Sequence, residues 1–201
     1  MDRNKNFFSS NRIEALSDGI FAIAMTILIL NINIPDKETV ARIGLHKSLI
    51  NQANEFYTYF LSFFLLGTFW VIQRRQMSII IKTDQRHTWL TIFLLMFICL
   101  VPFSASLQSD YGKEWVAALV FSGNMLIIGL FFLGTWHYIT KNNRLVSKDF
   151  NREDIIEGKQ RIMLFIIVSI IAMVTGLFIP SYAGLIFLLI PMFKPILRRI
   201  K

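Results

Sequence analysis

Long apolar runs separated by short charged segments constrain this chain more than any other feature. Apolar residues make up 54% of the 201 residues and charged residues 17%, and the charges fall between the runs instead of alternating with them. A helix needs about 20 apolar residues to cross the hydrocarbon core of a bilayer. The pattern therefore predicts an all-α integral membrane protein whose surroundings are a lipid bilayer.

Six of these runs are candidate transmembrane helices. We expect a single six-span domain over residues 1–201, with spans at approximately residues 12–34, 56–72, 89–107, 115–138, 161–179 and 182–197. The sixth is the weakest, because Pro191, Lys194 and Pro195 interrupt it. The last two cannot form one helix, since residues 162–193 would extend about 48 Å, well beyond a core of about 30 Å. We therefore expect a tight turn at residues 180–184.

The positions of the basic residues predict the topology. With a cytoplasmic amino terminus, 17 of the 21 Lys and Arg residues fall on the cytoplasmic side, and the four outside are Lys37, Arg42, Lys47 and Lys113. Because basic residues concentrate in cytoplasmic loops, we expect both termini in the cytoplasm and a location in the plasma membrane. The net charge of +8 is then a topology signal. No soluble module is present that would use this charge on nucleic acid, so we expect no such partner.

Catalytic and metal-binding patterns are weak in this sequence. His46, His87 and His137 lie on different segments, and no pair has the spacing of zinc ligands. Glycine-rich phosphate loops are absent as well. Cys99 is the one cysteine, so no internal disulfide forms. We expect no enzymatic activity, no cofactor and no resident metal.

The octet at residues 12–19 stands directly before the first apolar run. It contains Arg12, Glu14 and Asp18, and charged side chains at the mouth of an apolar helix are costly unless they are paired or face water. On a helix, Asp18 and Ser17 fall about 140° and 120° from Ile23, on opposite sides. We therefore expect the Asp18 carboxylate to face a neighbouring helix and to be satisfied by Arg12, a tryptophan N–H or a backbone donor.

An aliphatic stripe follows on the same helix. Ile23, Ile27 and Leu30 lie within about 40° of one direction, with Thr26 about 60° to the side. In a monomer such a stripe packs into the bundle core, whereas in a symmetric oligomer it surrounds a central axis as rings of apolar side chains. Periodicity alone favours the core, because helices ordinarily pack through aliphatic stripes.

Three segments resemble a known family. Residues 12–19 resemble the signature Arg-x-x-x-Phe-Ser-Asp-Gly at the start of the first helix in the transmembrane protein 175 family, the endolysosomal potassium channels and their prokaryotic relatives. Residues 20–26 are similar as well. Ser62, Phe63 and Trp70 resemble the family's second helix, and residues 100–103 its third.

Two departures from the family pattern are informative. Leu16 replaces the phenylalanine of the signature, an apolar change that alters packing only. Gln73 and Arg74 stand where many prokaryotic members carry a pair of histidines. A hydrogen-bond network built on those histidines is therefore lost here or rebuilt with guanidinium donors.

The resemblance implies a potassium-permeable cation channel, with potassium as the permeant ion. One copy of the signature is present, as in the prokaryotic members, which assemble as homotetramers around their first helices. Carried over, Ile23, Ile27 and Leu30 would form an apolar constriction, and Thr26 would supply the nearest hydroxyl. The signature and helix-packing network would comprise Arg12, Ser17, Asp18, Gly19 and Trp70. Since the sequence has no Thr-Val-Gly-Tyr-Gly filter, we expect only modest selectivity for potassium over sodium.

Two other function classes compete with a channel. A proton-coupled secondary transporter could use Asp18 as its coupling carboxylate. Matching broken helices in two halves would favour it, but Pro102, Pro180 and Pro191 have no such correspondence. A structural subunit without transport activity is the third reading, in which polar substitutions on the aliphatic stripe only destabilise the bundle. The stimulus that opens a pore is not encoded in any recognisable motif.

Overall fold

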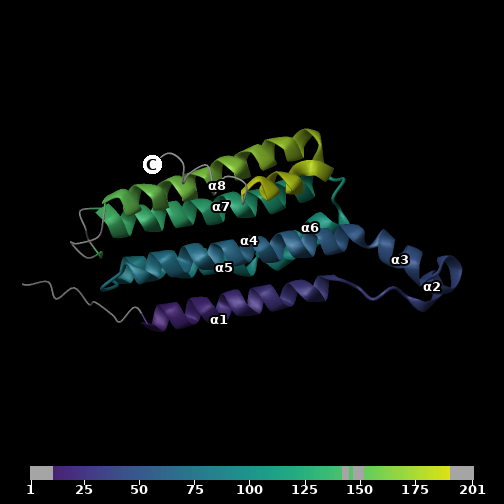
Figure 1. Ribbon diagram of the computed structural model, residues 1–201, viewed down its shortest axis with the longest axis horizontal. Coiled ribbons are helices and arrows are strands. Elements are labelled where there is room, and N and C mark those ends of the chain that lie inside the picture. Colours follow the sequence, from purple (N-terminus) through teal and green to yellow (C-terminus); the bar gives the residue numbers. More distant parts are fainter. Residues whose placement is uncertain (1–10, 142–144, 147–151, 191–201) are drawn as a thin grey trace, which may run out of the picture.

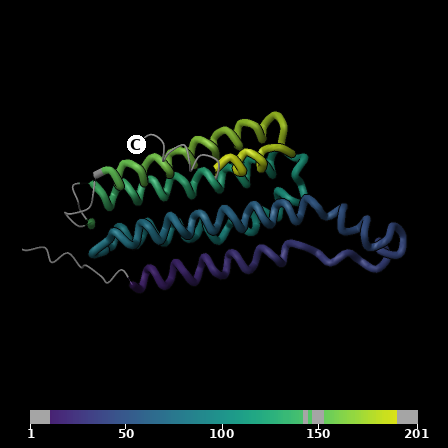
Figure 2. The backbone as a smooth tube through the Cα atoms, in the orientation of Figure 1, coloured from purple at the N-terminus to yellow at the C-terminus, as the bar shows by residue number. Residues whose placement is uncertain are grey.

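The computed structural model describes residues 11–141, 145–146 and 152–190 as a bundle of antiparallel helices (Figure 1). Within that part of the chain, five segments are long and apolar enough to cross a membrane. The chain runs from one end of the bundle to the other in each successive segment (Figure 2). The helices are α1 (Asn11–Ile27) with a short 3-10 turn η1 (Leu28–Asn31), α4 (Ala53–Ser78), α5 (Gln85–Cys99), α6 (Val101–Asp110), α7 (Trp115–Thr140), α8 (Arg152–Phe178) and η3 (Pro180–Leu189).

Each of the five segments overlaps one of the first five expected spans, although the ends differ. Helix α4 extends beyond the expected 56–72 at both ends, and α8 begins nine residues before residue 161. The sixth expected span, 182–197, overlaps η3, while its residues 191–197 lie outside the described part of the chain. Six spans and two cytoplasmic termini therefore remain predictions.

The helices are interrupted at two places that the sequence did not predict. Residues 180–184 do not form a tight turn, because they already belong to the helical η3. The chain turns instead at Ile179, whose φ of −138° and ψ of 73° lie outside the helical region. Pro180 suits the first position of the following helix because its missing N–H would have no partner there. The third span is also broken at Leu100, between α5 and α6, two residues before Pro102.

A helical hairpin that the apolar pattern did not predict projects beyond one end of the bundle (Figure 1). It consists of α2 (Lys37–Ile43) and α3 (Leu45–Asn51). The Asp36 carboxylate caps α2 by accepting the Thr39 backbone N–H at 2.8 Å, which lowers the pKa of Asp36 below its usual value. Gly44 joins the two helices with a φ of 82°, in the region that favours glycine.

Buried aromatic rings connect the helices at the centre of the bundle. The Phe69 ring of α4 meets the Phe165 ring of α8 edge to face, with centroids 4.9 Å apart. Phe165 lies 6.1 Å from Phe187 of η3, which meets Phe121 of α7 at 5.8 Å. Because such offset and edge-to-face pairs add to the energy of burial, they fix α4, α7, α8 and η3 as one body.

Candidate pore face and signature network

Helix α1 lies at the edge of the bundle and packs against α4, α5 and α6 through one narrow face (Figure 1). In its most apolar stretch, 28% of the residues are buried, against 50% in α7. The buried face is formed by Ile13, Ser17, Phe21, Ala24 and Leu28. Most of the circumference of α1 is therefore open within a single subunit.

The aliphatic stripe lies on this open side. Ile23, Ile27 and Leu30 are 59%, 42% and 75% exposed. The interpretation of the stripe as bundle core is thus wrong for the single subunit, since the face through Phe21 and Ala24, about 100° or more away, is the one that packs. The Thr26 hydroxyl donates to the Ile23 carbonyl at 2.9 Å, so its oxygen keeps its capacity to accept on the exposed side.

The Asp18 carboxylate is bound to the second span. The Trp70 indole N–H of α4 donates to Asp18 Oδ1 at 2.8 Å. Of the expected donors, which were Arg12, a tryptophan and a backbone N–H, it is thus the tryptophan that binds Asp18. Arg12 is exposed, and no acidic side chain of the described residues lies within salt-bridge distance of it. The Arg74 guanidinium lies over the Trp70 ring, 5.2 Å from its centroid. A cation on the face of the indole thus supports the same tryptophan that holds Asp18.

Ser17 and Gly19, the neighbours of Asp18, have opposite surroundings. Ser17 is buried, and its hydroxyl donates to the Ile13 carbonyl of the preceding turn at 2.8 Å. Gly19 is exposed, and a Cβ atom added to it would meet nothing within 4 Å. Packing inside the subunit therefore accounts for a small polar residue at position 17 but does not require glycine at position 19.

Buried polar residues also lie at the end of the bundle that holds Asp18. Gln73 and His87 were already named from the sequence, whereas Gln76 was not. Gln73 is 2% exposed, and no described group bonds to either of its amide atoms. Gln76 donates from Nε2 to the Phe132 carbonyl at 3.0 Å, which joins α4 to α7. His87 is fully buried, with Nδ1 2.7 Å from the Thr83 hydroxyl. Nothing in the sequence indicated their burial, because all three lie between the expected second and third spans and next to an arginine.

The described residues offer little else for chemistry along α1. Among them, no three His, Cys, Asp or Glu side chains lie close enough together to hold a metal ion. The features present are an exposed apolar helix face, one hydroxyl on that face and a carboxylate anchored at one end. Such a surface can pack against other helices or line a path for ions. Together with the five long apolar segments, it belongs to a multi-pass helical membrane protein.

Comparison with known proteins gives the family. Residues 12–102 match the family model described as endosomal/lysosomal potassium channel TMEM175. A potassium channel from Chamaesiphon minutus is 33% identical over 149 residues, 73% of each chain, and one from Streptomyces collinus is 34% identical over 140 residues, 68% of this chain and 67% of the relative. The crystal structure of a lysosomal potassium-selective channel TMEM175 homologue from Chamaesiphon minutus has a TM-score of 0.82 and 27% identity, covering 94% of this chain and 97% of that one.

The chain belongs to the TMEM175 family, as a prokaryotic member with one repeat. The resemblance of residues 12–19 to the family signature is thereby confirmed. These relatives are ion channels by name and not enzymes.

Proposed function

We propose that this protein is a potassium-permeable cation channel of the plasma membrane. Four copies assemble with α1 of each subunit around a central pore, and each subunit has six spans with both termini in the cytoplasm. The observation that carries this proposal is the exposed aliphatic stripe of α1, which lies opposite the face that packs into the subunit. Two relatives that are 33% and 34% identical to this chain are named potassium channels, which supports the same function.

Assembly around α1 explains its weak packing within the subunit. A helix with only 28% of its apolar stretch buried gains contacts when neighbouring copies surround it. Gly19 has open space at its Cα within the subunit, and small residues let helix backbones approach closely in membranes. We therefore place Gly19 near a neighbouring subunit, at the same end as Asp18.

The pore would be controlled by apolar rings. Four copies of Ile23, Ile27 and Leu30 form constrictions that pass ions only when wetted, as in hydrophobic gates. The Thr26 hydroxyl oxygen, which still accepts, is the polar group beside them. With no ring of backbone carbonyls from a filter loop, potassium is favoured over sodium through pore width and partial dehydration, so selectivity is modest.

Asp18 has a structural role in this proposal. Its carboxylate accepts the Trp70 N–H and so ties the inner end of α1 to α4. Arg12, Ser17 and Gly19 flank this anchor and keep the inner ends of the four pore helices in register. A proton-coupled transporter would instead need Asp18 free to bind and release its proton.

Ion flux into proteoliposomes tests the proposal. Wild-type protein is expected to pass potassium faster than sodium, without saturation and without proton coupling. Ile23→Asn places a polar group in the constriction and is expected to raise the flux or reduce selectivity at unchanged oligomer size. Ile171→Asn is the matched control, because Ile171 is a similarly exposed isoleucine (49%) on α8. Equal flux effects of both variants, or saturable proton-driven uptake by the wild type, would contradict a pore along α1.

A further inference from the structure

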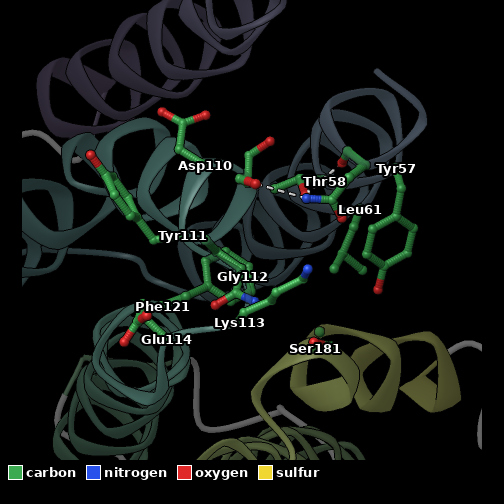
Figure 3. A pocket seen from close by; sticks show the side chains of 14 residues that line it. Tyr57, Thr58, Leu61, Asp110, Tyr111, Gly112, Lys113, Glu114, Phe121 and Ser181 are labelled. Carbon is green, nitrogen blue, oxygen red and sulfur yellow. Dashed lines mark hydrogen bonds between the residues drawn. The ribbon is translucent and has the colours of Figure 1, made fainter. Parts of the chain in front are cut away.

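A pocket of about 480 Å³ opens at the end of the bundle opposite the signature octet, and α1 does not line it (Figure 3). It lies between the first turns of α4, the end of α6, the start of α7 and the start of η3. Leu61 and Phe121 give it apolar walls, while Asp110, Lys113 and Glu114 bring charges of both signs. Its size and mixed lining are those of small-ligand sites.

Two buried polar groups in this pocket have no hydrogen-bond partner among the residues that the structure describes. Gln108 is 8% exposed, and no described group donates to its buried carbonyl oxygen Oε1. The buried Tyr57 hydroxyl is likewise unbonded within the described residues. Because buried polar groups are nearly always hydrogen-bonded, and leaving one unmet is unfavourable, these two groups indicate an external partner.

Two glycines allow the backbone to lie close to these polar groups. A Cβ atom at Gly184 of η3 would lie 3.1 Å from the Tyr57 hydroxyl oxygen. At Gly112, in the turn between α6 and α7, a Cβ atom would lie 2.8 Å from the Gln108 backbone carbonyl. A larger residue at either position would press on the polar groups of the pocket.

Lys113 supplies the cationic part of the site. Its side chain reaches into the pocket (Figure 3), and no carboxylate of the described residues lies within 4.0 Å of its ammonium group. It is also the one basic residue of the proposed outer side that lies outside the segment 37–47. A lysine there runs against the usual concentration of basic residues in the cytoplasm.

The polar groups of the pocket would each bind a different part of one ligand. Lys113 favours an anionic oxygen, Gln108 Oε1 requires an N–H or O–H donor, and the carboxylates of Asp110 and Glu114 favour a cation. We propose that the pocket binds a small zwitterion that carries an oxyanion and a primary ammonium group, as phosphoethanolamine does. The oxyanion pairs with Lys113 and the ammonium group donates to Gln108 Oε1. A phospholipid headgroup and a free solute can both supply this chemistry.

Lipid retention and thermal unfolding test the site with full-length purified protein. Native mass spectrometry compares added phosphatidylethanolamine with phosphatidylcholine, whose ammonium group has the same charge but no N–H. We expect about tenfold stronger retention of phosphatidylethanolamine, the size of one charge-assisted hydrogen bond. A rise in unfolding temperature with free phosphoethanolamine, but not with ethanolamine or phosphate alone, and without a lipid preference, would assign the site to a soluble zwitterion instead.

Three variants connect the binding to the pocket. Lys113→Gln is expected to lower the retention of both lipids, because both carry the phosphate, and Gln108→Leu is expected to lose the preference for phosphatidylethanolamine. Lys47→Gln on α3, an exposed lysine outside the pocket, should change neither. Because Lys113 is exposed, its variant decides the matter even where Gln108→Leu fails to fold, as judged by circular dichroism. The proposal is overturned by equal retention of both lipids together with no response to phosphoethanolamine in folded wild-type protein. Retention of phosphatidylethanolamine that is unchanged in folded Lys113→Gln overturns it as well.

Discussion

At the scale of single residues, Trp70 joins α4 to α1 and makes two kinds of contact, a hydrogen bond and a cation–π contact. Its indole N–H bonds to Asp18 of α1, and its ring carries the Arg74 guanidinium on one face. Arg74 stands where many family members have a histidine, and in this chain it acts on the network through the ring of Trp70. Gln73, the other departure, is buried among the helices. Trp70 is therefore the residue through which Arg74 and Asp18 are connected.

Replacing Trp70 by phenylalanine tests this bond. Trp70→Phe keeps an aromatic ring but removes the donor to Asp18, and should lower the free energy of unfolding by about 1 kcal/mol, the usual net value of a hydrogen bond. Trp89→Phe on α5 is the control, because Trp89 is 52% exposed and its ring lies beside that of Phe93. The measurement is thermal unfolding in detergent. Equal effects of the two substitutions would mean that the Asp18 bond contributes nothing measurable.

Asp18 itself is expected to matter for assembly before selectivity. Asp18→Ala removes the acceptor and leaves the Trp70 N–H unmet, so we expect a lower yield of oligomer in size-exclusion chromatography. Asp18→Asn keeps an oxygen that accepts the same N–H and should assemble almost normally. A normal oligomer yield for Asp18→Ala, combined with altered selectivity, would place the carboxylate in the ion path instead.

At the scale of helices, α7 and α8 pack along most of their length, and glycines permit their close approach (Figure 1). Gly158 of α8 lies against the Trp136 indole of α7, where an added Cβ atom would be 2.3 Å from the ring. The same indole donates from Nε1 to the Ile155 carbonyl at 3.0 Å. The last turns of α7 and the first turns of α8 are thus held together by a large ring that packs on a residue without a side chain.

Gly158→Ala should therefore loosen this contact. The new methyl group has to displace the Trp136 ring, and overpacking of this kind costs about 2 kcal/mol. Gly134→Ala on α7 is the matched control, because a Cβ atom there meets nothing within 4 Å, and alanine should be neutral or slightly stabilising in a helix. Chemical or thermal unfolding measures both. An unchanged stability of Gly158→Ala would mean that Trp136 is not held as described.

The limits of sequence interpretation are also clearest for helices. Apolar runs predicted where the long helices lie, because the bilayer sets their length. They did not predict helix ends, which depend on local caps such as Asp36 and Asp84, or on the residue before Pro180. Periodicity could not tell which side of α1 packs, since the face through Phe21 and Leu28 is as apolar as the stripe through Ile23 and Ile27. The Asp18 partner was among those expected because the helical angle turned it towards a neighbour.

At the scale of the whole molecule, the weak packing of α1 distinguishes this bundle from one that is stable as a monomer. The helices α4 to α8 form the body with the aromatic core, and α1 is attached to it along one side (Figure 2). An exposed stripe of aliphatic residues on such a helix is large enough to mark an interaction surface. In the tetramer that we propose, this surface faces the central axis and the neighbouring copies, and the remaining exposed helices face lipid.

Thiol modification during flux tests a pore along α1 most directly. In a Cys99→Ser background, Leu30→Cys places a thiol on the stripe in η1, at the end of the first span away from Asp18. Leu177→Cys places one on α8, where Leu177 is 49% exposed. If α1 lines the pore, a charged, membrane-impermeant thiol reagent should block potassium flux through Leu30→Cys and leave Leu177→Cys unaffected. Flux that is unchanged by the reagent in Leu30→Cys, with modification verified by mass spectrometry, would contradict a pore along α1.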